Sequence, residues 1–319
     1  MKRRQLISYA SLSAIPAMSW AQSAKPIRLI VPFPAGGPTD LVARVVAEPM
    51  GRLLGQPVIV DNKGGAGGSI GTAELARAQP DGLTLGIASV STHGVNPVVY
   101  KKLAYDPIKD FSPICELCKA PTNLVVHPSL PVTTVAEFIA YLKKNPGKVN
   151  YGSPGNGSNN QMLAELFKSA TNTFMVHIPY RGTGPAMVDL LSGQIQVYFD
   201  QVASSITHIK SGKLRSLAVS WHQRLDVLPN VPTFAEASLF GNNKPSWFGL
   251  LAPAKMPDTE IRRVHQAVIK SLAEPSVKER FAQLGLFASG GTPEELAAVI
   301  RKELDTMSRI AKFAKISLD

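Results

Sequence analysis

Short apolar runs alternate with amphipathic segments along most of this sequence. The runs are rich in β-branched residues and have the length of buried strands, whereas the segments between them repeat apolar residues at helical spacing. Predicted strands lie at 27–31, 58–60, 84–88, 112–117, 124–126, 149–151, 174–178, 195–199 and 214–219. Predicted helices begin at 41 and cover 72–78, 135–143, 159–170 and 185–192, with a helical tail. This alternation predicts an α/β fold of mostly parallel sheets flanked by helices.

Residues 1–21 have the features of a signal peptide. A positive start at Lys2, Arg3 and Arg4 precedes a short apolar stretch and a Ser19-Trp20-Ala21 cleavage site. The stretch is too short to span a bilayer. The mature protein is therefore expected in the periplasm, and general secretion and twin-arginine export both stay open.

Composition narrows the classes of function. The chain has 319 residues and a formal charge of +11, of which three charges belong to residues 2–4 and +8 to the rest. This length suggests one large or two medium domains. No basic run or interleaved aromatic patch accompanies this positive charge, so nucleic acid is not an expected partner. We expect instead that the charge weakly steers anions toward the protein.

The loop after the first predicted strand is almost bare of side chains. Pro34 to Pro38 reads PAGGP, which lets a ligand approach the backbone N–H groups closely, and Thr39 is the expected N-cap of the following helix. A glycine loop at a helix start can bind an anion. An ordinary strand-to-helix turn is the alternative. The spacing matches no nucleotide-binding motif.

Three later loops carry polar groups directly after predicted strands, where ligands bind in such sheets. They are 88–93, 152–158 and 180–184, and Asp200 follows a fourth strand. Turn and capping chemistry is the alternative for each loop. Arg181 could form paired hydrogen bonds with a carboxylate, whereas a carboxylate at Asp200 would disfavour a second acid group and favour an amino, amide or hydroxyl function.

Enzymatic and metal chemistry find little support. Gly67 to Gly71 formally matches the G-x-S-x-G elbow of hydrolases with Ser69 as nucleophile, but glycine and alanine residues separate it from the preceding strand. Cys115 and Cys118 lack the further ligands that zinc needs. Three residues apart in a strand, they should point to opposite faces, so we expect two small buried side chains, with a labile disulfide as the alternative. No catalytic residue, metal or cofactor is predicted.

The stretch VPFPAGGPTDLVAR (31–44) closely resembles the signature loop of the Bug family, the periplasmic substrate-binding proteins of tripartite tricarboxylate transporters. The likeness continues through VIVDNKGGAGGSIGTAELARAQPDGLTL, YDPIKDFSPI, YGSPGNGS, PYRGTGPAMVDLLSGQI and SWFGLLAP, and covers essentially all of the mature chain. This chain departs from the family at Gln161, where members often have histidine, and at the cysteine pair, where they usually have apolar residues. Asp200 matches a recurrent polar position.

The resemblance implies a two-lobed periplasmic binding protein fold, similar to type II, with lobe 1 at 22–122 plus 246–319 and lobe 2 at 123–245. The hinge would lie near 119–123 and 244–247. It implies a monomer that closes over a small carboxylate and docks on membrane subunits of a transporter; a ligand sensor that presents its closed form to a membrane receptor is the alternative. The expected ligand-binding residues are Phe33, Ala35, Gly36, Gly37, Thr39, Asp40, Ser91, Ser153, Ser158, Arg181, Gly182, Thr183 and Asp200.

Overall fold

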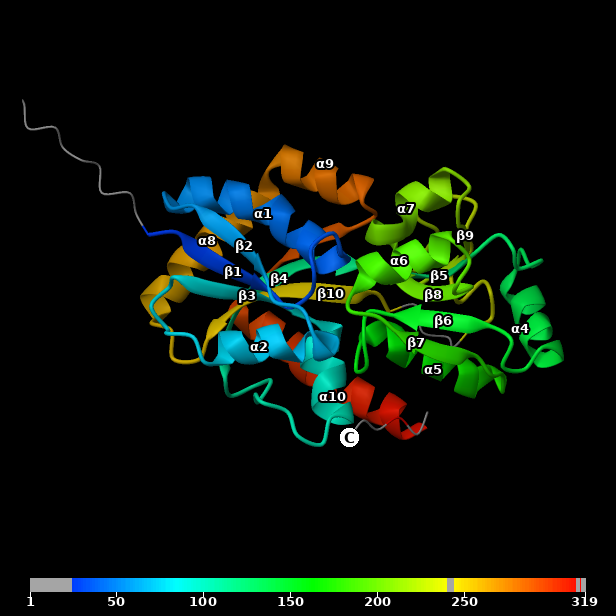
Figure 1. Cartoon of the computed structure of the whole chain (residues 1–319). Coiled ribbons are helices and arrows are strands. Elements are labelled where there is room, and N and C mark those ends of the chain that lie inside the picture. The colour runs from blue at the N-terminus through cyan, green and yellow to red at the C-terminus, as the bar shows by residue number, and fades with distance from the viewer. Residues whose placement is uncertain (1–24, 240–243, 314–315, 317–319) are drawn as a thin grey trace, which may run out of the picture.

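Two β-sheets organise the protein, and helices cover both faces of each (Figure 1). The computed structural model describes residues 25–239, 244–313 and 316, so the predicted signal peptide lies outside the described residues. The first sheet has the order β11-β4-β10-β3-β1-β2, with strands β1 Ile27–Val31, β2 Val58–Asn62, β3 Thr84–Ser89, β4 Phe111–Ala120, β10 Ser246–Pro253 and β11 Phe287–Gly290. The second has the order β7-β6-β8-β5-β9, with strands β5 Thr122–Val126, β6 Asn150–Ser153, β7 Val176–Pro179, β8 Val197–Gln201 and β9 Arg215–Val219.

Two apolar layers sandwich the first sheet. One layer is formed by α1 (Pro38–Leu54), α8 (Asp258–Ala273) and α9 (Pro275–Gln283). The other is formed by α2 (Ser69–Ala76), the helical turns η1 (Ala66–Gly68) and η2 (Ser91–Val95), α3 (Asn96–Val99) and α10 (Pro293–Phe313). Neighbouring residues of β10 show the alternation that builds both layers, since Phe248 packs in the first and Trp247 in the second.

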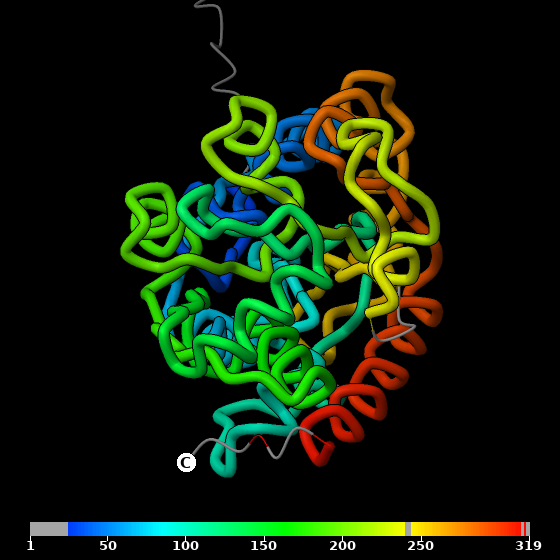
Figure 2. The backbone as a smooth tube through the Cα atoms, turned by 90° about the vertical axis from the view of Figure 1, so that its right-hand side faces the viewer, coloured from blue at the N-terminus to red at the C-terminus, as the bar shows by residue number. Residues whose placement is uncertain are grey.

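The second sheet is covered in the same way. Helices α4 (Val135–Lys144) and α5 (Asn159–Thr171) pack on one face, and α6 (Thr183–Leu191) and α7 (Val202–Lys210) pack on the other. Helix α10 packs on the first sheet and also contacts α5, which covers the second sheet. Figure 2 shows α10 running along the outside of the molecule. It starts at a capping box, in which Glu295 N donates to Thr292 Oγ1 at 3.2 Å and Thr292 N donates to Glu295 Oε2 at 2.8 Å.

The α/β fold is confirmed, but both sheets are mixed rather than mostly parallel. Strand β1 pairs in parallel with β2 and β3, and β6 pairs in parallel with β7 and β8. The antiparallel pairs involve strands close to the points where the chain crosses from one sheet to the other. Strand β10 is antiparallel to β3 and β4, β11 is antiparallel to β4, and β5 is antiparallel to β8 and β9. Strand β10 begins beside the C-terminal end of β3, so it runs antiparallel to β3.

The two cysteines lie on β4 as free, fully buried thiols, which confirms that they are small buried side chains. The expectation that they point to opposite faces is wrong. Cys118 pairs with Phe248 and Cys115 with Leu250, and partners two residues apart on β10 share a face. A β-bulge at Leu117 adds one residue to β4, and this extra residue brings Cys115 and Cys118 to the same face of the strand. Burial raises the pKa of Cys115 to about 12, so its thiol is unreactive at neutral pH.

Candidate functional site

A cavity of ≈ 380 Å³, counted with the solvent at its mouth, lies between the two sheets. Elements of both sheets contribute to its wall. From the first come the loop before α1, the end of β3 and the start of β10; from the second come the starts of α5 and α6 and the end of β8. The lining residues are Phe33, Pro34, Gly37, Pro38, Thr39, Ser89, Ser91, Pro154, Asn160, Thr183, Gln201, Ser246 and Phe248.

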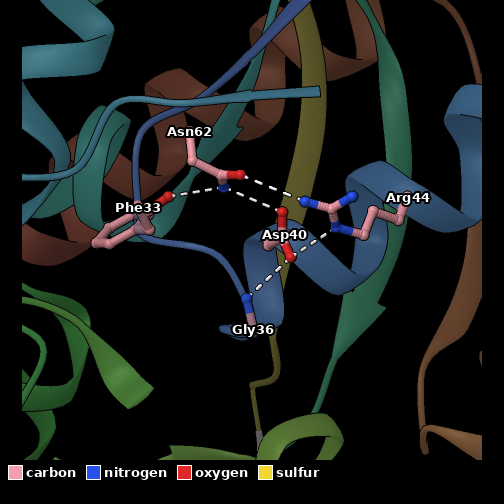
Figure 3. A network of polar contacts seen from close by, with 5 residues as sticks. All are labelled: Phe33, Gly36, Asp40, Arg44 and Asn62. Atoms are coloured by element: carbon pink, nitrogen blue, oxygen red, sulfur yellow. Dashed lines mark hydrogen bonds and ion pairs between the residues drawn. The ribbon is translucent and has the colours of Figure 1, made fainter. Parts of the chain in front are cut away.

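A polar network fixes the loop before α1 (Figure 3). The Asp40 carboxylate accepts hydrogen bonds from Gly36 N at 2.9 Å and Arg44 Nε at 2.9 Å, and from Asn62 Nδ2 at 3.0 Å. The same Asn62 amide donates to Phe33 O at 3.0 Å. Burial would raise the pKa of Asp40, but these donors lower it below its ordinary value. Asp40, a predicted ligand-binding residue, therefore braces the loop from behind and does not line the cavity.

The start of α1 differs from the sequence prediction at one residue. Gly37, not Thr39, is the N-cap, because Pro38 occupies the first helical position, for which its fixed φ is suited. Thr39 lies in the first turn and lines the cavity. The positive φ of this loop belongs to Gly36, at +82°, whereas Gly37 has an ordinary φ of −82°.

The start of α6 faces the start of α1 across the cavity. Thr183 is its first residue, and a Cβ on Gly37 would lie 3.7 Å from Thr183 Cβ. Gly182 precedes it with φ +115°, and a Cβ there would lie 2.6 Å from Pro34 Cγ of the other sheet. Only glycine combines this φ with so close an approach. The fold thus brings the predicted anion-binding loop before α1 next to loop 180–184, one of the three predicted polar loops.

Of the thirteen predicted binding residues, the cavity wall includes Phe33, Gly37, Thr39, Ser91 and Thr183. Ala35, Gly36 and Arg181 are exposed outside it, and Gly182 packs on Pro34. Ser153 and Ser158 have local roles: Ser153 Oγ lies 2.7 Å from His177 Nε2, and Ser158 caps α5 by accepting from Gln161 N. Turn and capping chemistry is therefore what the structure shows at these two serines.

Asp200 is fully buried behind the cavity wall on β8. It accepts a hydrogen bond from Ser204 Oγ at 2.6 Å. Burial raises the pKa of Asp200 to about 7. Its neighbour Gln201, which the sequence analysis did not single out, lines the cavity instead, since successive strand residues point to opposite faces.

Ser89 lies within the predicted loop 88–93 but was not among the expected binding residues, and Asn160 and Ser246 in the wall were not predicted. A signal existed for two of the missed residues. Gln201 ends the strand before α7, where the strand-end rule that selected Asp200 applies equally, and Ser246 opens the SWFGLLAP segment. Asn160 lies in the first turn of α5, where a sequence reads as ordinary helix.

The serine and histidine contact in the second sheet is not a catalytic pair. Gln161 Oε1 accepts from Gly157 N at 2.8 Å, so its Nε2 is the donor that faces His177 Nδ1 at 3.4 Å. His177 then carries its proton on Nε2 and donates to Ser153. A ring nitrogen that donates to the hydroxyl cannot act as its base. Ser69, the serine of the G-x-S-x-G match, is the first residue of α2.

A larger cavity of ≈ 560 Å³ lies behind Ser246, next to α10. Its wall combines apolar side chains such as Leu163 and Met307 with the charged Lys244 and Glu303, and neither α1 nor α6 contributes to it. We place the site in the smaller cavity because the starts of α1 and α6 meet there. Among the described residues, no three His, Cys, Asp or Glu side chains are placed to share a metal ion. No helix within that part of the chain is long and apolar enough to cross a membrane.

Comparison with known proteins identifies relatives over almost the whole chain. Protein BugT of Bordetella pertussis is 34% identical over 300 residues, which cover 94% of this chain and 92% of BugT. A solved structure of a periplasmic transporter is 45% identical, with TM-score 0.91, and covers 94% of this chain and 100% of that one.

Two solved relatives hold carboxylates. Rpa4515 of R. palustris, solved with adipate, is 32% identical and has a TM-score of 0.89. The match covers 93% of this chain and 99% of the Rpa4515 chain. MatC of Rhodopseudomonas palustris, solved with malate, is 32% identical and has a TM-score of 0.86. The match covers 90% of this chain and 99% of the MatC chain.

The family model described as tripartite tricarboxylate transporter family receptor matches residues 42–316. The family and its structural neighbours are solute-binding receptors and not enzymes, in agreement with the donor arrangement at Ser153. The fold, the facing helix starts and these relatives lead to one conclusion: the chain belongs to the receptor family of tripartite tricarboxylate transporters, which includes the Bug proteins.

Proposed function

We propose that the protein captures a small organic carboxylate in the periplasm for a tripartite tricarboxylate-type transporter, after export by residues 1–21. The observation that carries the proposal is the pair of helix starts, α1 and α6, which face each other across one cavity. Helix starts have unpaired N–H groups and partial positive charge, which favour a carboxylate between them. The carboxylates bound by Rpa4515 and MatC support this ligand class.

We further propose that two lobes close over the ligand: residues 22–122 plus 246–319, and residues 123–245. Several contacts between the sheets support this. Tyr100 Oη donates to Asn156 O at 2.8 Å, and Asn159 N donates to Ser91 Oγ at 2.9 Å. Both bonds join the two proposed lobes and would break when the lobes separate. Strand β4 ends at Ala120 and β5 begins at Thr122, so a passage of one residue would serve as a hinge.

A thermal-shift screen of the mature protein tests the ligand class. Monocarboxylates, dicarboxylates, aromatic acids and acidic amino acids are added one at a time, and hits are titrated by calorimetry. A ligand that binds only the folded state adds about 2.7 kcal/mol at a hundredfold excess over Kd, which corresponds to a rise in Tm of roughly 5 °C. No stabilisation by any acid would refute the proposal.

A further inference from the structure

The second sheet buries a carboxyl group beside the cavity. Asp200 lies on β8, is fully buried, and is directly followed by Gln201 in the cavity wall. Its Oδ2 accepts a hydrogen bond from Ser204 Oγ at 2.6 Å, whereas its Oδ1 has no hydrogen-bond partner among the described residues. Buried polar atoms are nearly always paired, so this oxygen indicates a place for a proton or a further group.

A second unpaired oxygen lies on the same strand. Tyr198 precedes Asp200 by two residues, so both side chains are on one face of β8, and Tyr198 packs under α6. Its Oη also lacks a hydrogen-bond partner within the described part of the chain. Burial and the charge of Asp200 raise the pKa of Tyr198, whereas the Thr183 side chain lowers it, so both groups lie near this hydroxyl. Since Thr183 is the first residue of α6 and lines the cavity, Asp200 lies beneath that helix start.

The surroundings of Asp200 disfavour its charged form. The elements around it bring groups without charge in the part of the chain that the structure describes: Asn123 on β5, Thr183 on α6, Ser204 and Ser205 on α7, and Tyr198 on β8 itself. Tyr198 is neutral at neutral pH because its pKa is raised. A buried carboxylate without a cation is costly, and this burial raises the pKa of Asp200 to about 7. Near neutral pH the group therefore exists in both its charged and its neutral form.

An acid bound at the start of α6 would shift this equilibrium. Two negative charges repel strongly in a region of low dielectric constant, so the carboxylate of the ligand favours the neutral form of Asp200. The neutral carboxyl group carries a proton and can donate a hydrogen bond. Binding of the acid and protonation of Asp200 therefore strengthen each other, and this coupling is reciprocal.

We infer that the site captures an organic carboxylate together with one proton, which Asp200 holds. The inference rests on the proposed function and adds a second ligand, the proton, to the same site. Affinity for the acid should then fall as the pH rises above neutrality. The histidines of the neighbouring loops do not account for such a proton, because burial lowers the pKa of His93 to about 3 and that of His177 to about 4.

The test is titration calorimetry of the mature protein with acetate, succinate, adipate, malate and benzoate at pH 6.5 and pH 8.5. The Kd of the tightest acid should rise on the order of 20-fold between these pH values, because at pH 8.5 nearly every ligand-free molecule must first gain a proton on Asp200. At pH 7.5, phosphate and Tris buffers differ in ionisation enthalpy, and their comparison should show uptake of between about half a proton and one proton per acid. An unchanged Kd without proton uptake overturns the inference and leaves the proposed function intact. Failure of every acid at both pH values overturns both.

Variants assign the proton to a residue. Asp200→Asn keeps an acceptor for Ser204 but cannot titrate, so its Kd should change less than about threefold between pH 6.5 and pH 8.5, without proton uptake. Glu303→Gln is the matched control and should keep the wild-type uptake, because Glu303 is another carboxyl group whose pKa is raised by burial but lines the larger cavity. Wild-type uptake in Asp200→Asn contradicts the assignment. If Asp200→Asn does not fold, the wild-type buffer comparison decides, since absence of uptake there already overturns the inference.

Discussion

The two helix starts that face each other across the cavity are held in different ways. The loop before α1 is fixed within its own sheet, by the bonds that Asp40 accepts from Gly36, Arg44 and Asn62. The loop before α6 gains its closest packing from the other sheet, where Gly182 lies against Pro34. We infer that the α1 half of the site is preformed and that the α6 half is completed only when the lobes meet.

The largest expected effect is that of Gly182→Val. A Cβ would overlap Pro34 Cγ, at 2.6 Å, and φ +115° is unfavourable for valine. We expect affinity for an identified acid to fall on the order of 100-fold, about 2.7 kcal/mol. Calorimetry measures it. Gly184→Ala is the control, because a Cβ there meets nothing within 4 Å and the amide is kept. Unchanged binding would show that the α6 loop need not approach Pro34.

Gly37→Val should have the next largest effect, with a loss of affinity of roughly 30-fold. The φ of −82° at Gly37 suits valine, so the ligand-free fold should keep its Tm, but a Cβ there already lies 3.7 Å from Thr183 Cβ, and the methyl groups would extend into the space between the helix starts. Thermal unfolding and calorimetry together separate the two expectations. A variant that binds normally would place the ligand away from the α1 start.

Asp40→Asn tests the preformed half. Removing the charge weakens the bonds to Arg44 and Gly36, so we expect a stability loss of about 1–3 kcal/mol and roughly tenfold weaker binding. Because the pKa of Asp40 is lowered in the folded state, its contribution is present above the unfolded pKa of about 3.9 and is lost as the pH falls through the folded value. Urea unfolding at pH 3 to 7 should show the wild-type advantage shrinking below about pH 4. The exposed Asp226→Asn is the control, and equal losses in both variants would remove the network from the account.

Thr39→Val should have the smallest effect. Its hydroxyl has no partner within the described residues, so Tm should not change in the ligand-free protein, whereas affinity should fall about threefold if the hydroxyl contacts the acid. Thr207→Val, on the exposed face of α7, controls for the substitution. Wild-type affinity in Thr39→Val would exclude this hydroxyl from ligand contact.

The sequence predicted the elements better than their meeting points. The alternation of apolar runs located nearly every strand. The bare loop before α1 contributes Gly37 to the cavity wall, whereas Gly36 lies outside it. The sequence pattern placed the N-cap of α1 at Thr39 and not at Gly37, because Pro38 takes the first helical position. It could not show the β-bulge at Leu117, because that bulge depends on pairing with β10. Gln201 and Ser246 lie at the ends of strands in different sheets, so only the fold brings them to one cavity.

Solution scattering of the mature protein, with and without a saturating acid, tests most directly whether the two halves of the site come together on binding. The account predicts that the radius of gyration falls when the ligand is added, and that Gly182→Val keeps the larger value at the same ligand concentration. Titration calorimetry first establishes saturation. A tightly bound acid that leaves the scattering curve unchanged would contradict closure of the α6 half over a preformed α1 half.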